Sequence, residues 1–180
     1  MKSVLKFFFI SMIVFLPQIV LGQTKNVTNL VKPFNSDNEI KIKGATLDDE
    51  KNISITIELN DLSTKWVMAA NEMFGGSKTA GEIRTNKILD YLFKSARGVF
   101  KKIPTAESIK LYVASFSIER DSYGHKIGED KTLDGQLVIS KETVEKLNWE
   151  YINELLHKSN SNQELLEFLD GYKFYTTQFE

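Results

Sequence analysis

The chain has 180 residues, with 23 basic and 24 acidic side chains, two histidines and no cysteine. Without cysteine it forms no disulfide, offers no thiol nucleophile and cannot carry the lipid-modified N-terminus of a lipoprotein. A net charge of −1 and only three arginines exclude a nucleic-acid-binding protein, which typically concentrates a basic excess on one face.

The first 22 residues have the pattern of a secretory signal peptide. Lys2 and Lys6 precede an apolar run from Phe7 to Leu21, and the small residue Gly22 closes it. A retained membrane anchor is the alternative, but Pro17 interrupts the run, and a spanning helix needs about 20 apolar residues. We therefore expect cleavage after Gly22, export to the periplasm or the extracellular space, and no stable membrane span afterwards.

Cleavage would leave 158 of the 180 residues, which is the size of one ordinary domain. Residues 23–38 are polar and rich in turn-forming side chains, so we expect a flexible leader there and a single α+β domain at 39–180. The mature chain would carry a formal charge of −3, which gives no reason to expect adsorption to an anionic membrane. Its lysine-rich, arginine-poor composition is typical of AT-rich bacterial genomes.

Alternating isoleucines predict the first hairpin. Ile40 and Ile42 alternate with lysines, and the isoleucines of 53–57 alternate with polar residues, with the charged turn 48–52 between the two runs. A period of two is typical of strands that have one face on a core and one in water. We therefore expect these two runs to pair as an antiparallel hairpin.

Two helices are predicted after this hairpin. Capping residues at 60–63 and apolar side chains from Trp66 to Phe74, spaced by three and four, predict a short helix. A wide apolar stripe predicts a longer helix from Thr85 to Ile103, and Pro104 ends it.

A second hairpin is predicted next. The run from Ile109 to Ile118 is apolar on both faces, which is typical of a central strand, and its partner runs from Lys131 to Ile139. The connection from Arg120 to Asp130 contains Gly124 and is long for a hairpin loop.

The C-terminal part predicts two more helices. Ser140 is the expected cap of a helix that reaches His157, and in it we expect the ring of Trp149 to pack on the sheet. A capping box of Ser161 and Glu164 predicts a last short helix at 165–169. The tail 172–179 alternates aromatic and polar residues, which makes it a candidate edge strand.

These elements together predict an α+β fold. Its sheet would have four antiparallel strands from two hairpins, in ββαββα order, with the helices packed on one face. The repeated order of hairpin and helix leaves open whether the two halves arose by duplication.

The connection Arg120–Asp130 contains the side chains with the most functional chemistry. Asp121, His125 and Glu129 are of types that bind metals or move protons, and Tyr123 stands between them. Their spacing does not match a calcium loop, and two histidines in the whole chain give weak support for zinc. We therefore take Asp121, Tyr123, His125 and Glu129 as a candidate interaction loop and expect no catalytic residue, metal or cofactor.

Three hypotheses of function remain open from the sequence. The first is a non-catalytic binding domain of the cell envelope, whose partner is an envelope protein or component of unknown identity. The second is a metal-dependent or hydrolytic enzyme centred on the 120–130 loop. The third is a structural subunit of an envelope assembly, in which the aromatic tail pairs with a neighbour.

Overall fold

The structure is a computed structural model that describes residues 24–32, 39–60, 65, 68–69, 71–73, 75–76, 78–158 and 161–179. The predicted signal peptide lies outside the described residues. So do residues 33–38 of the predicted leader and most of the predicted short helix, including Trp66 and Phe74.

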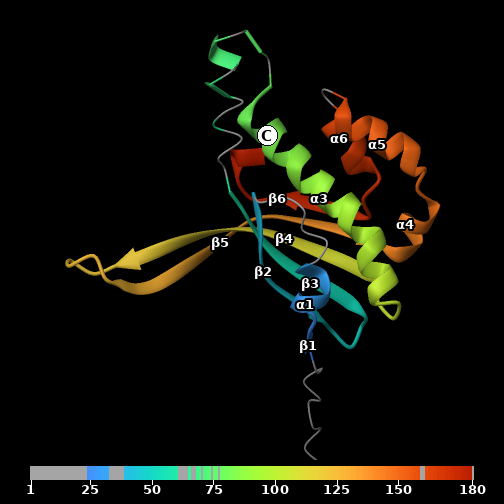
Figure 1. The fold of residues 1–180 in the computed structure, drawn as a ribbon, viewed down its shortest axis with the longest axis horizontal. Coiled ribbons are helices and arrows are strands. Elements are labelled where there is room, and N and C mark those ends of the chain that lie inside the picture. Colours follow the sequence, from blue (N-terminus) through green and yellow to red (C-terminus); the bar gives the residue numbers. More distant parts are fainter. Residues whose placement is uncertain are drawn as a thin grey trace, which may run out of the picture.

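The described strands form one six-stranded sheet in which they lie in chain order (Figure 1). In that order they are β1 (Lys25–Asn26), β2 (Ile40–Leu47), β3 (Asn52–Leu59), β4 (Ser108–Arg120), β5 (Lys126–Ser140) and β6 (Gly171–Phe174). Four neighbouring pairs are antiparallel. The pair β3–β4 is parallel, with Asn52 opposite Ser108 and Ile57 opposite Val113, so the sheet is mixed.

The predicted four-stranded antiparallel sheet is therefore wrong in two respects. The edge strands β1 and β6 widen the sheet to six strands, and the two hairpins join each other in parallel. Parallel neighbours need a crossover connection, which is usually a helix. The long helix between the hairpins is that crossover, because it returns the chain to the end of the sheet where β3 begins.

The helices pack mainly on one face of the sheet, with α3 crossing it diagonally and the C-terminal helices beside α3 (Figure 1). The described helices are α1 (Thr28–Val31), α3 (Ala80–Lys102), α4 (Lys141–Lys146), α5 (Trp149–His157), α6 (Asn162–Glu167) and the 3-10 turn η2 (Thr177–Phe179).

Helix α3 begins earlier than the apolar stripe predicts, at Ala80 instead of Thr85. Thr79 and Glu82 form a capping box: the Thr79 hydroxyl accepts the backbone N–H of Glu82 at 3.1 Å, and the Glu82 carboxylate accepts the backbone N–H of Thr79 at 2.6 Å. Two of the otherwise unpaired N–H groups of the first turn are satisfied in this way.

The predicted helix 140–157 is two helices, α4 and α5. Ser140 caps α4, as its position suggests, because its hydroxyl accepts the backbone N–H of Thr143 at 3.1 Å. The chain then leaves helical geometry at Leu147, and Asn148 starts α5 by accepting the backbone N–H of Tyr151 at 3.3 Å. The expected capping box before α6 does not form, since Ser161 makes no side-chain cap bond.

The core lies between the sheet and α3. The three isoleucines of β3 (residues 53, 55 and 57), Leu111 of β4 and Phe93 of α3 are fully buried in it. Part of the predicted leader also contributes, because Val27 and Val31 are buried in the same cluster. Burial of this apolar surface is the main favourable contribution to folding, and no disulfide supplements it.

Candidate functional site

The outer halves of β4 and β5 form a two-stranded arm that projects from the sheet (Figure 1). Strand β3 pairs with β4 only as far as Val113, and β6 pairs with β5 only within Gly135–Val138. Residues 114–134, which we call the arm, therefore pair with no described strand other than each other. Their ladder extends to Arg120 and Lys126.

The arm leaves the sheet at a β-bulge. Val113 lies opposite Gly135 but Ala114 lies opposite Leu133, so Asp134 is the extra residue. The buried carboxylate of Asp134 accepts a hydrogen bond from the Ser115 hydroxyl at 2.5 Å. Because a bulge increases the local twist of a strand pair, it sets the direction in which the arm leaves the sheet.

Asp121 organises the turn at the end of the arm. Its Oδ1 accepts the backbone N–H of His125 at 2.8 Å and that of Tyr123 at 2.9 Å, and these bonds lower the pKa of the carboxyl below its usual value. Gly124 has a φ of 86°, a left-handed conformation that favours glycine. The guanidinium of Arg120 donates to the Gly124 carbonyl at 2.6 Å and closes the turn.

The structure brings together some of the predicted site residues but not all. Asp121 Oδ2 lies 3.1 Å from His125 Nδ1, and the rings of Tyr123 and His125 are 6.4 Å apart between centroids. Glu129 lies away from this pair, on β5 opposite Ile118. The long connection expected at 120–130 is mostly strand, and only residues 121–125 form the turn.

Glu129 instead belongs to a cluster that links the arm to β2 and β3, which we call the Lys43 cluster. Lys43 Nζ lies 3.1 Å from Glu129 Oε1, 3.5 Å from Glu58 Oε2 and 3.8 Å from the centre of the Phe116 ring. Lys126 Nζ lies 2.6 Å from the other oxygen of Glu129. Hydrogen bonds from Lys126 and then Lys43 lower the pKa of Glu129 to about 2, and the bond to Glu129 raises the pKa of Lys43.

Large apolar side chains are exposed near the end of the arm. Tyr123 is 85 % exposed, Ile127 67 % and Ile118 50 %. The sequence analysis selects Tyr123 but not the two isoleucines, although Ile127 lies within the predicted connection 120–130. A signal was available, because an isoleucine between Lys126 and Gly128 has no apolar partner at the spacing of two that a buried strand face shows.

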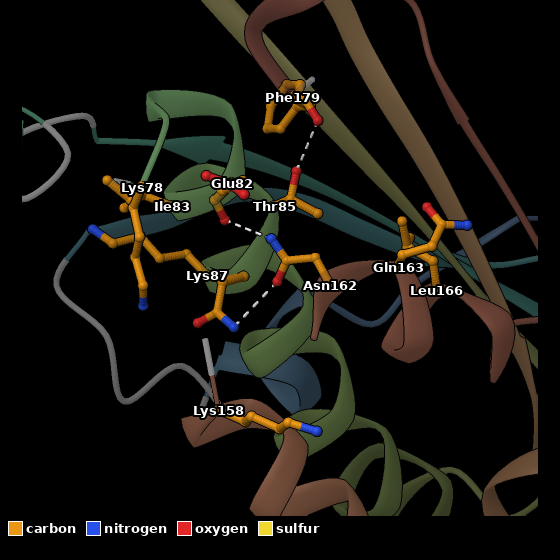
Figure 2. Close-up of a pocket in the computed structure, with 11 residues that line it drawn as sticks. Lys78, Glu82, Ile83, Thr85, Lys87, Lys158, Asn162, Gln163, Leu166 and Phe179 are labelled. Carbon is orange, nitrogen blue, oxygen red and sulfur yellow. Dashed lines mark hydrogen bonds between the residues drawn. The ribbon is translucent and has the colours of Figure 1, made fainter. Parts of the chain in front are cut away.

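A cavity of about 430 Å³ lies where the beginnings of α3 and α6 meet η2 (Figure 2). Its polar side chains bind one another: Asn162 donates to the Glu82 carbonyl at 2.7 Å, and Asn86 donates to Asn162 Oδ1 at 3.3 Å. The Thr85 hydroxyl donates to the Phe179 carbonyl at 3.1 Å. These hydrogen bonds hold α6 and η2 against α3. We therefore interpret this cavity as a structural contact between elements and not as a binding site.

Among the residues that the structure describes, no group of three or more His, Asp or Glu side chains is placed to hold a metal ion. No helix in the described part of the chain is both long enough and apolar enough to cross a membrane. Comparison with protein-family models, curated protein sequences and solved structures gives no match to this chain.

Proposed function

We propose that this protein is an exported, non-catalytic binding domain of the cell envelope, and that the end of its arm is the contact surface for a protein partner. The proposal rests on three large apolar side chains that are exposed on the projecting hairpin, Ile118, Tyr123 and Ile127. All three lie in one stretch of ten residues, 118–127. Large apolar side chains that gather at an exposed position are typical of interaction sites.

The chemistry around these side chains suits a protein partner. Tyrosine is enriched among the residues that dominate binding energy, and polar side chains commonly surround such anchors. Here Arg120, Asp121 and Lys126 surround Tyr123 in the turn and at its ends. The bonds made by Asp121 and Arg120 fix the turn before any partner arrives, which lowers the entropy lost on binding.

The two other hypotheses receive less support. An enzyme centred on the 120–130 loop needs Asp121, His125 and Glu129 to converge, whereas Glu129 pairs with Lys126 and Lys43. A subunit that lends its aromatic tail to a neighbour needs that tail to be available. Strand β6 of the tail pairs with β5 of the same sheet, and Phe174 stacks on the buried Phe179 at 5.2 Å.

The test is capture of partners from the envelope fraction of the native cell, with the wild-type protein and a tip variant, Tyr123→Ser/Ile127→Ser. The variant removes one aromatic and one aliphatic side chain that pack on nothing in the core, so the fold is expected to survive. We expect a protein that the wild type captures to bind the variant at least about tenfold more weakly, because anchor residues typically contribute 2 kcal/mol or more.

The matched control is Leu30→Ser/Tyr172→Ser, which removes the same two classes of exposed side chain away from the arm. This control is expected to keep the affinity of the wild type. Equal binding by the tip variant and the wild type to every captured protein would contradict the proposal, as would an equal loss in the control.

A further inference from the structure

Two cavities lie side by side between α3 and the α4–α5 segment, away from the arm. The larger has a volume of about 440 Å³, within the usual size range of small-molecule sites, and the smaller about 200 Å³. Arg97 and Trp149 line both cavities. The larger is also lined by Phe100, Lys101, Lys141, Val144 and Glu145. We call the larger cavity the Arg97 cavity.

The polar side chains of the Arg97 cavity are mostly hydrogen-bond donors. Arg97 and Lys101 are exposed to solvent, and among the described residues neither makes an ion pair or a hydrogen bond within the protein. Lys141 donates to the Pro104 carbonyl at 3.2 Å. Glu145 is the one carboxylate among the described lining residues.

The negative end of the α3 dipole does not account for all of the positive charge that lines this cavity. Lys101 and Lys102 lie in the last turn of α3, where cations offset the negative end of the helix dipole. Arg97 lies one turn earlier, where that effect has fallen off. Its planar guanidinium matches the geometry of a carboxylate or phosphate with two parallel hydrogen bonds. Three cations against one carboxylate also contrast with the net charge of −1 of the whole chain.

Aromatic side chains supply the apolar part of the cavity. Phe100 is almost fully buried, and Trp149 is half-buried and packs against the core where α5 begins, beside α3. Arg97 and Lys101 lie four residues apart on α3 and therefore share one side of the helix, and Phe100, three residues after Arg97, lines the same cavity. The cavity thus combines a cationic side with an aromatic wall.

The geometry points to a binding site for a small organic polyanion in the Arg97 cavity. The ligand carries two or more carboxylate or phosphate groups that accept from Arg97, Lys101 and Lys141. A planar or apolar body packs against Trp149. This site is independent of the arm and adds a ligand to the binding function proposed above.

The test uses benzene-1,3,5-tricarboxylate as the probe, titrated into the full chain by calorimetry and by NMR of the Trp149 indole N–H. The chain has two tryptophans, so Trp66→Phe leaves Trp149 as the sole indole and assigns its signal. We expect saturable binding that shifts this signal and weakens as salt rises. Citrate, which has the charge without the ring, is expected to bind more weakly, and benzyl alcohol, which has the ring without the charge, is expected not to bind.

Two variants with opposite expected effects on affinity distinguish a site that depends on charge from a general loss of structure. Arg97→Gln/Lys101→Gln is expected to weaken binding of the tricarboxylate by about tenfold or more, because two charge-assisted donors are lost. Glu145→Gln is expected to strengthen it by about threefold, because the opposing carboxylate is gone. The control Lys25→Gln/Lys102→Gln removes two exposed lysines that line none of the cavities described here, and is expected to keep most of the wild-type affinity.

Unchanged affinity in the Arg97→Gln/Lys101→Gln variant, or an equal loss in the control, would overturn the assignment. Equal affinity for citrate and the tricarboxylate would do so too, as would binding of benzyl alcohol as tight as that of the tricarboxylate. Tetraglutamate binding much more tightly than every small anion would also overturn it, in favour of an acidic peptide. Loss of partner binding through the arm would leave these titrations unchanged, so the two proposals fail separately.

Discussion

The side chain of Lys43 contacts residues on three other strands of the sheet, which no local sequence pattern predicts. From β2 it contacts Glu58 on β3, Phe116 on β4 and Glu129 on β5. The pair Lys43–Glu129 joins residues 86 positions apart in the chain and is partly shielded from water. A partly shielded pair is screened less by salt than an exposed one, so Lys43 is well placed to hold the arm to the rest of the sheet.

Lys43→Met is expected to loosen the arm without unfolding the sheet. Methionine keeps an apolar side chain over Phe116 but loses the charge that pairs with Glu129. We expect amide hydrogen exchange within residues 114–134 to become about two- to fivefold faster, the range that the loss of one such ion pair implies. Lys41→Met is the control. Lys41 lies on the same strand, but its side chain is largely exposed and its Nζ lies 3.9 Å from Glu58 Oε2, which is a longer contact than those of Lys43. Equal exchange in both variants would contradict this role of Lys43.

At the scale of single residues, the sequence indicates contacts between residues that are close in the chain but not contacts between distant ones. Asp121 and Tyr123 belong to the candidate interaction loop because of their chemistry within the connection 120–130, and the structure places both in the turn. Glu129 was grouped with them because it is close in sequence. Strand β5 has begun by Lys126, so Glu129 faces a partner from β2 that no spacing within the loop could indicate.

At the scale of elements, helix ends depend on capping residues more than on the apolar stripe. The stripe of α3 begins near Ile88, which led to a predicted start at Thr85, although Thr79 and Glu82 already had the spacing of a capping box. Asn148 similarly divides the predicted helix 140–157, because its side chain starts a new helix. Both signals were present in the sequence, but the apolar periodicity continues across them.

Thr79→Ala tests the importance of the cap of α3. The substitution removes the hydroxyl that accepts the Glu82 N–H, and we expect the free energy of unfolding to fall by about 1 kcal/mol. Urea denaturation followed by circular dichroism measures this change. Thr105→Ala, at an exposed position just after α3, is expected to change stability by less than about 0.5 kcal/mol. A loss for Thr105→Ala as large as that for Thr79→Ala would argue against a specific role of the cap.

At the scale of the whole molecule, the alternation of Ile53, Ile55 and Ile57 predicts a strand, and the apolar stripe after it predicts the long helix. The parallel pair was not predicted, although a strand, a helix and a second strand in succession form the connection that parallel neighbours require. The edge strands were harder to predict. β1 has only two residues, and β6 has four, so neither has enough alternation for a clear pattern.

Export is a property of the whole chain and has a direct measurement. If residues 1–22 are a signal peptide, N-terminal sequencing of the protein from the envelope fraction of its native cell is expected to begin at Gln23. Val27, the first buried core residue in the part of the chain that the structure describes, lies four positions later, so this cleavage would remove none of the described core. An intact Met1 on protein recovered from the cytosol would contradict export and the envelope partner inferred from it.

The parallel pair β3–β4 also has a consequence for the order of folding. Each hairpin is closed by a short local turn, whereas Asn52 meets Ser108 only after the 55 intervening residues, α3 among them, have been gathered. The entropy of closing so long a loop must be offset before these contacts form, and non-local contacts of this kind slow folding. The centre of the sheet is therefore the last part to close, and until it does the isoleucines of β3 remain open to competing strands.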